Sequence, residues 1–146
     1  MAVYSRILLA IDFTAATDTV VKQALDLRQA FNARLSLVHV VEFMQIDLYN
    51  DLVMPQEFEI DRDMIQRATQ RLQELAEKQG IDKSECFVQV GSTRREILNL
   101  AEELNIDLIV IGSHGREGIQ RLLGSTANAV LHGAPCDVLA VRIKND

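Results

Sequence analysis

The sequence predicts an α/β fold with an open, mostly parallel sheet and helices on both faces. Three observations lead to this prediction. Short runs of consecutive apolar residues, typical of strands buried on both faces, recur along the chain. Stretches with apolar residues at helical spacing lie between them. The two patterns alternate, and a chain of 146 residues suits one domain, residues 1–146.

The first part of the chain predicts two strands with a helix between them. Residues 6–12, RILLAID, form a short apolar run that ends in an acid, and residues 35–41, LSLVHVV, form a second run. Residues 17–31 carry apolar side chains at helical spacing and predict an amphipathic helix. Residues 42–61 then contain six acidic residues and no Lys or Arg. We interpret this segment as a long, partly ordered and solvated surface loop that leads into a helix, with a lid or partner site as the alternative.

The second part of the chain continues the alternation. Ile65, Ala68, Leu72 and Leu75 form the apolar stripe of a helix that Gly80 is expected to cap. The next helix is expected to begin at Ser92 or Thr93, with a capping box between Thr93 and Glu96. The buried face of this helix is expected to consist of Ile97, Ala101 and Leu104. The other expected elements are a helix over 125–131 and strands over 86–90, 108–111 and 138–143.

Composition narrows the class of protein. A net charge of −6 argues against a general nucleic-acid binder. No apolar run approaches the roughly 18 residues of a membrane span, and the N-terminus has no secretory signal pattern. Cys86 and Cys136 fit neither a metal-ligand nor a CxxC spacing, which favours reduced thiols and a cytoplasmic location.

The stretch GSHGREGIQRLLGST, residues 112–126, follows the predicted fourth strand directly. Ligands of open parallel sheets bind at the carboxyl ends of the strands. Glycine lets a backbone approach an anion closely, and a helix N-terminus offers unpaired N–H groups to phosphate. Asp12, at the end of the first strand, could accept hydrogen bonds from a ribose. The spacing is neither a Walker A loop nor GxGxxG, so a plain turn-and-cap loop is the alternative.

Five segments together resemble the universal stress protein family: ILLAID, LSLVHV, DLIVIGSHGR, LLGSTANAVL and PCDVLAVR. The resemblance covers essentially the whole chain. It implies a five-stranded, Rossmann-like sheet of strand order 3-2-1-4-5, of the adenine nucleotide α-hydrolase-like type, and a homodimer. The apolar strand over 138–143 is expected to pair the two copies, because it would otherwise leave a sheet edge unpaired.

The family has an ATP-binding branch and a branch without nucleotide. The ATP-binding branch resembles the pattern G-x2-G-x9-G-S/T. The resemblance implies ATP, with Mg²⁺ or Mn²⁺, as the ligand. His114 lies inside the motif and either contacts a phosphate or bonds to nearby backbone. The other implied contacts are Gly112, Gly115, Gly124, Ser125 and Thr126 for the phosphates, Asp12 for the ribose, and Val40 and Ile111 for the adenine.

This chain departs from the family pattern at one point. Eight residues separate Gly115 from Gly124, where the pattern has nine. Gly118 lies within this span and can let the chain turn tightly enough to absorb the missing residue. Members without nucleotide usually lack these glycines, so their presence here favours ATP binding.

Three functions from different classes remain open at this point. The first is an ATP-binding, stress-response module, and the second is a dimeric interaction scaffold without nucleotide. The third is an enzyme that transfers adenylate or hydrolyses ATP. The sequence contains neither HIGH nor SGGxDS and no recognisable nucleophile–base pair, which disfavours the third. His39 is interpreted as a core histidine, and His132 as a residue near a helix C-terminus.

Overall fold

The structure is a computed structural model that describes residues 3–42, 55–113 and 124–143, with residues 55–61 described as helical backbone only. Five strands form one sheet in the order β3-β2-β1-β4-β5, and every neighbouring pair is parallel. The predicted fold class and strand order are confirmed. The strands are β1 (Arg6–Ala10), β2 (Arg34–Glu42), β3 (Cys86–Gly91), β4 (Leu108–Gly112) and β5 (Asp137–Val141).

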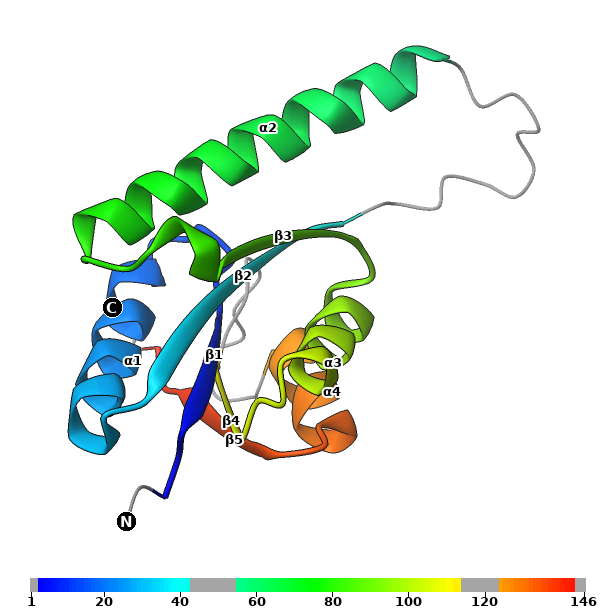
Figure 1. The fold of residues 1–146 in the computed structure, drawn as a ribbon. Coiled ribbons are helices and arrows are strands. Elements are labelled where there is room, and N and C mark those ends of the chain that lie inside the picture. The colour runs from blue at the N-terminus through cyan, green and yellow to red at the C-terminus, as the bar shows by residue number, and fades with distance from the viewer. Residues whose placement is uncertain (1–2, 43–54, 114–123, 144–146) are drawn as a thin grey trace.

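Helices cover both faces of the sheet (Figure 1). One core cluster joins the sheet to α1 and α2, and the other joins it to α3 and α4. Among the described residues, no helix combines the length and the apolar character that a membrane crossing needs. The helices are α1 (Thr17–Phe31), α2 (Pro55–Lys78), α3 (Thr93–Glu103) and α4 (Ser125–Gly133), with a short 3-10 helix, η1 (Lys83–Glu85), before β3.

The central strands explain why the sheet could be read from apolar runs. Leu8 and Leu9 in β1 are completely buried, and so are Ile109 and Val110 in β4. Side chains of successive residues point to opposite faces of a sheet, so a strand covered on both faces needs apolar residues throughout. These four side chains therefore fix β1 and β4 in the middle of the molecule.

The segment over residues 42–61 leads into a helix as expected, but the helix begins earlier than predicted. Helix α2 begins at Pro55, ten residues before the apolar stripe that starts at Ile65. Proline is favoured at the first position of a helix, and acids such as Glu57 and Glu59 are favoured in its first turns by the helix dipole. The first part of the segment, residues 43–54, lies outside the described residues.

The predicted capping box on α3 is also wrong. Ser92 is the N-cap and makes no side-chain cap bond, and Thr93 is the first helical residue. The Thr93 hydroxyl instead donates a hydrogen bond to Glu42 Oε1 at 2.6 Å. Glu96 then lies four residues after the cap, one too many for a capping box. By contrast, Gly80 follows α2 with φ = 71°, which confirms its predicted capping role.

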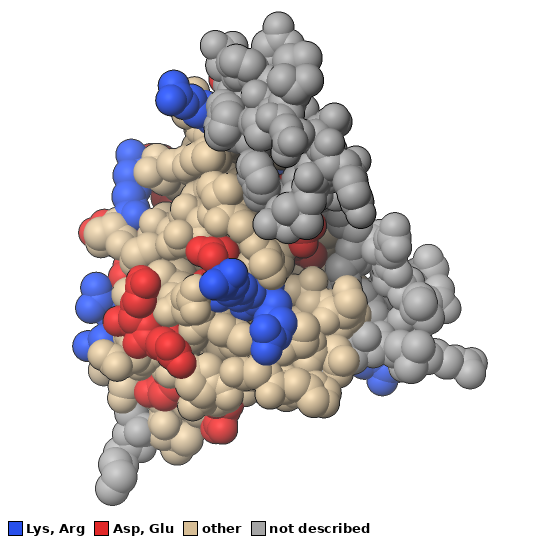
Figure 2. Space-filling model, turned by 90° about the vertical axis from the view of Figure 1, so that its right-hand side faces the viewer, with Lys and Arg blue, Asp and Glu red and all other residues tan. Residues whose placement is uncertain are grey.

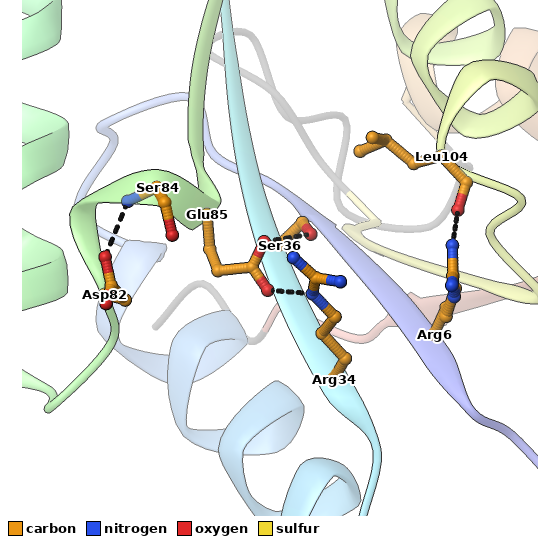
Figure 3. A network of polar contacts seen from close by, with 7 residues as sticks. All are labelled: Arg6, Arg34, Ser36, Asp82, Ser84, Glu85 and Leu104. Carbon is orange, nitrogen blue, oxygen red and sulfur yellow. Dashed lines mark hydrogen bonds and ion pairs between the residues drawn. The ribbon is translucent and has the colours of Figure 1, made fainter.

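Polar contacts hold the amino edge of the sheet, the edge at which its strands begin (Figure 3). Glu85 in η1 accepts a hydrogen bond from Arg34 Nε at 2.5 Å and one from the buried Ser36 hydroxyl at 3.4 Å. Asp82 Oδ1 accepts from the backbone N–H of Ser84 at 2.9 Å. Arg6, the first residue of β1, donates a side-chain hydrogen bond to the carbonyl of Leu104 at 3.0 Å. These contacts lie at the opposite edge from the glycine-rich stretch.

Candidate functional site

Three of the predicted site residues, Asp12, Val40 and Gly112, lie at the carboxyl edge of the sheet. Asp12 follows β1, the central strand, while Val40 lies near the end of β2 and Gly112 ends β4. Strands β2 and β4 are the two neighbours of β1. The register pairs Ala10 with Val38 and Leu9 with Val110, so Asp12, Val40 and Gly112 follow at about the same level.

Helix α4 begins at this edge with its backbone N–H groups uncapped by any described side chain. Gly124 is the N-cap, and no side-chain cap bond is present. The N–H groups of the first turn have no partner within a helix, and together with the helix dipole they favour an anion. Ser125 is exposed and Thr126 is half-buried. The start of α4 therefore has the properties of a phosphate-binding site.

The backbone conformation of Gly124 does not require a glycine. Its φ of −59° and ψ of 154° lie in the extended region that any residue can adopt. Glycine is a common residue at a helix N-cap. The lack of a Cβ leaves room for an anion to approach the backbone, which fits the phosphate role implied for Gly124.

The two ends of the glycine-rich loop are held together at its base. The N–H of Gly124 donates a hydrogen bond to the carbonyl of Ser113 at 2.6 Å. The eight-residue spacing is thus compatible with a start of α4 that lies directly against the end of β4. His114, Gly115 and Gly118 lie outside the described residues.

Asp12 differs from its predicted position. It is not part of β1, which ends at Ala10. Its Oδ1 accepts hydrogen bonds from the N–H and the hydroxyl of Thr14, at 3.1 and 2.9 Å, and the residue is exposed. A carboxylate has acceptor positions for about four hydrogen bonds, so these two leave capacity for a ligand. The turn fixes the direction of the carboxylate at the edge of the sheet.

Val40 and Ile111 are core residues. Their side chains are 7% and 6% exposed, and both pack in the cluster that joins the sheet to α3 and α4. A flat base could contact only the small exposed part of each. Their implied role beside an adenine stays a prediction.

A comparison with known families decides the family. The model of the universal stress protein family matches residues 3–142. The chain belongs to the universal stress protein family. Universal stress protein A homolog 2 of Coxiella burnetii is 41% identical over 143 residues, which cover 97% of this chain and 97% of that protein.

Solved universal stress proteins share the fold. Universal stress protein UspA from Lactobacillus plantarum aligns with a TM-score of 0.74 and 26% identity over 97% of this chain and all of that one. A universal stress protein solved in complex with cAMP aligns with a TM-score of 0.61 and 24% identity, over 94% of this chain and 96% of that one. The recognition made from the sequence is confirmed.

Sequence patterns missed Phe13, which follows Asp12 in this universal stress protein. Phe13 has φ = 55°, a left-handed conformation that costs an ordinary residue about 1–2 kcal/mol. The Arg71 guanidinium lies 4.3 Å from the centre of its ring, and the His39 ring lies 4.6 Å from it. These contacts from α2 and β2 hold the turn that carries Asp12. Residues so distant in sequence gave no local signal of this arrangement.

His39 is hydrogen-bonded, as predicted, but only half-buried. Its Nδ1 lies 2.6 Å from the carbonyl oxygen of Ile11. A carbonyl can only accept, so Nδ1 carries the hydrogen and donates it. His132 is exposed near the end of α4, and its Nδ1 lies 2.8 Å from the carbonyl of Asn128. Both rings thus have structural roles.

Charges on the face formed by α3 and α4 are mixed (Figure 2). Basic side chains appear in separate small groups among acidic ones, without a continuous basic strip on the described part of this face. Within the described ranges, no group of three or more His, Cys, Asp or Glu side chains is placed to hold a metal ion.

The two thiols are expected to react slowly in the folded protein. Cys86 and Cys136 are free and half-buried, and burial raises the pKa of each thiol. The thiolate is the reactive form, so a raised pKa lowers its population at pH 8 and reactivity recovers only as the pH rises further. Iodoacetamide labelling followed by mass spectrometry should be several-fold slower in buffer than in denaturant. Equal rates would mean that the thiols are accessible and not shifted.

Proposed function

We propose that the protein is an ATP-binding stress-response module of the universal stress protein family that acts as a homodimer in the cytoplasm. The observation that carries the proposal is the start of α4. Its first backbone N–H groups make no side-chain cap bond, and it is tied to the end of β4 by the hydrogen bond between Gly124 and Ser113. The solved family member in complex with cAMP supports an adenine nucleotide as the class of ligand.

In this proposal the nucleotide would span the carboxyl edge of the sheet. The triphosphate would lie at the N–H groups of the first turn of α4, where the Ser125 and Thr126 hydroxyls add donors. Asp12 would accept from the ribose hydroxyls, and the adenine would lie towards Val40 and Ile111. Gly112, Gly115 and His114 would line the phosphate end. ATP would carry Mg²⁺ or Mn²⁺ with it.

Binding rather than turnover is the proposed activity. The sequence contains neither HIGH nor SGGxDS, the motifs that an adenylate-transferring enzyme would be expected to carry. Bound ATP would then act as a signal that changes the protein's surface or stability. Adenylate transfer and fast hydrolysis are not part of the proposal.

The second copy would pair along β5. This strand is at the edge of the sheet, and its residues Val138 to Val141 are apolar and half-buried. An apolar edge strand tends to pair with another strand. A groove beside it is lined by further apolar side chains, among them Phe31 and Leu131. The groove extends the apolar surface that a partner copy would cover.

Replacing Asp12 with alanine tests the nucleotide proposal. Hydrogen bonds to a charged group contribute about 1.5–3 kcal/mol, so the Kd for MgATP should rise roughly 10- to 150-fold while the fold survives. Isothermal titration calorimetry measures the change.

Asp82→Ala provides a matched control. Asp82 is exposed and accepts a backbone N–H two residues on, as Asp12 does, but it lies at the amino edge. Its loss should leave the Kd unchanged. If Asp12→Ala binds ATP as tightly as wild type, the carboxylate serves only the turn with Thr14, and the ribose role is wrong.

A further inference from the structure

Ser113 is a buried polar residue at the junction of three segments. It is 8% exposed, and Ser36 is the other buried polar residue of the described core. Its N–H donates to the carbonyl of Val141 at 2.8 Å. Its hydroxyl oxygen accepts from the N–H of Ile143 at 3.0 Å. Its carbonyl accepts from the N–H of Gly124 at 2.6 Å.

The Ser113 hydroxyl continues the hydrogen bonding between the β4 and β5 segments past the ends of the two strands. The last pair of the ladder is Gly112 with Val141, where both strands end. One residue after the end of β4, the Ser113 hydroxyl acts as the acceptor in place of a backbone carbonyl and binds the N–H of Ile143. A buried hydroxyl without a partner is costly, so this arrangement favours a single position for the chain at Ser113.

The same residue fixes the start of α4. Because the Ser113 carbonyl bonds to Gly124, any displacement of Ser113 moves the first turn of α4 relative to the strands. Asp12 is held independently by Thr14, and the turn at Phe13 is held by His39 and Arg71. A change at Ser113 should therefore alter the phosphate end of the site and leave its ribose end in place.

We propose that Ser113 is a positioning residue for phosphate binding, whose hydroxyl fixes the start of α4 by tying the end of β4 to the segment that follows β5. The identity of the ligand in this inference rests on the proposed function. The link from β4 to Ile143 and Gly124 rests on the hydrogen bonds of Ser113 alone. Ser113 is not assigned any contact with the nucleotide.

The first measurement compares MgATP with adenosine, which lacks phosphates. Ser113→Ala should raise the Kd for MgATP about tenfold, the effect of losing roughly one hydrogen bond, and change the Kd for adenosine less than twofold. Ser113→Thr keeps a hydroxyl and should restore ATP binding. Equal weakening for both ligands, or none for ATP, would overturn the positioning role.

Ser36→Ala is the matched control. Ser36 is 5% exposed, and its hydroxyl bonds to Glu85 at the amino edge (Figure 3). The substitution removes the same atoms from the same core and should destabilise the fold without changing the ratio of ATP to adenosine affinity. A changed ratio in Ser36→Ala would show that the ratio reports only general destabilisation, which would also overturn the proposal.

Amide hydrogen exchange of the ligand-free protein tests the tie without any nucleotide. Ser113→Ala should speed exchange at Ile143 and Gly124 about tenfold, with Thr14 unchanged. Unaltered exchange at both amides contradicts the inference, whatever the ligand data show. If wild type binds no ATP but the amides respond as expected, the proposed function fails and the tie remains a structural feature, so the two failures are distinguishable.

Discussion

Replacing Gly124 with valine is expected to abolish measurable ATP binding while the sheet stays folded. Valine can adopt the extended backbone conformation of Gly124, and its N–H can still donate to Ser113. The added side chain occupies space beside the first turn of α4. Losing two phosphate hydrogen bonds would weaken binding by roughly 3–6 kcal/mol, or at least about 100-fold.

Ser92→Val is the control for this substitution. Ser92 is the N-cap of α3, has φ = −74° and ψ = 127°, and makes no side-chain cap bond. The two variants therefore place the same side chain at equivalent helix positions. Calorimetry and thermal unfolding should show similar melting temperatures for both, with ATP binding lost in Gly124→Val alone. Retained binding in Gly124→Val would exclude phosphate from the start of α4.

Replacing Leu139 with lysine is expected to convert the proposed dimer into monomers. Leu139 lies in the middle of β5 and is half-buried. In a symmetric dimer paired along β5, each interface would contain two such lysines, and burying unpaired charge is costly. The dissociation constant should rise about 100-fold or more. Light scattering at micromolar protein concentration measures the change.

The opposite sheet edge supplies the control for the dimer. Val90 lies in the other edge strand, β3, and is 39% exposed. Val90→Lys should leave the dimer intact. Leu139 and Val141 both pack against the core, so thermal unfolding first shows which of Leu139→Lys and Val141→Lys stays folded, and that variant is the test. A monomeric wild type, or a dimer unaffected by either β5 variant, would exclude β5 as the dimer interface.

The core strands and the order of elements could be predicted, because burial on both faces requires uninterrupted apolar runs. The start of α2 could not, since the pattern of apolar residues begins at Ile65 although the helix begins at Pro55. Apolar periodicity reports which face of a helix is buried, and a turn of helix that extends beyond the core leaves no such pattern. Proline and acidic residues were the available signal.

The phosphate role of Gly124 and its neighbours stays a prediction, which the family resemblance implies. The residues that support the site could not be predicted. The left-handed turn at Phe13 and the contact with Arg71 depend on how α2 packs, which spacing does not encode. Ser113 lies between two motif residues, yet its importance comes from bonds to Val141 and Ile143 at the far end of the chain. Local sequence gave no reason to select it.

The measurement that tests the central claim most directly is a titration of wild-type protein, freed of co-purified nucleotide, with a fluorescent ATP analogue in the presence of Mg²⁺. The account predicts saturable binding that unlabelled ATP displaces. It also predicts that mass spectrometry finds adenine nucleotide released when the protein as first purified is denatured. No saturable binding up to millimolar analogue, with no nucleotide released, would contradict the account and favour a dimeric scaffold that uses the same fold without a ligand.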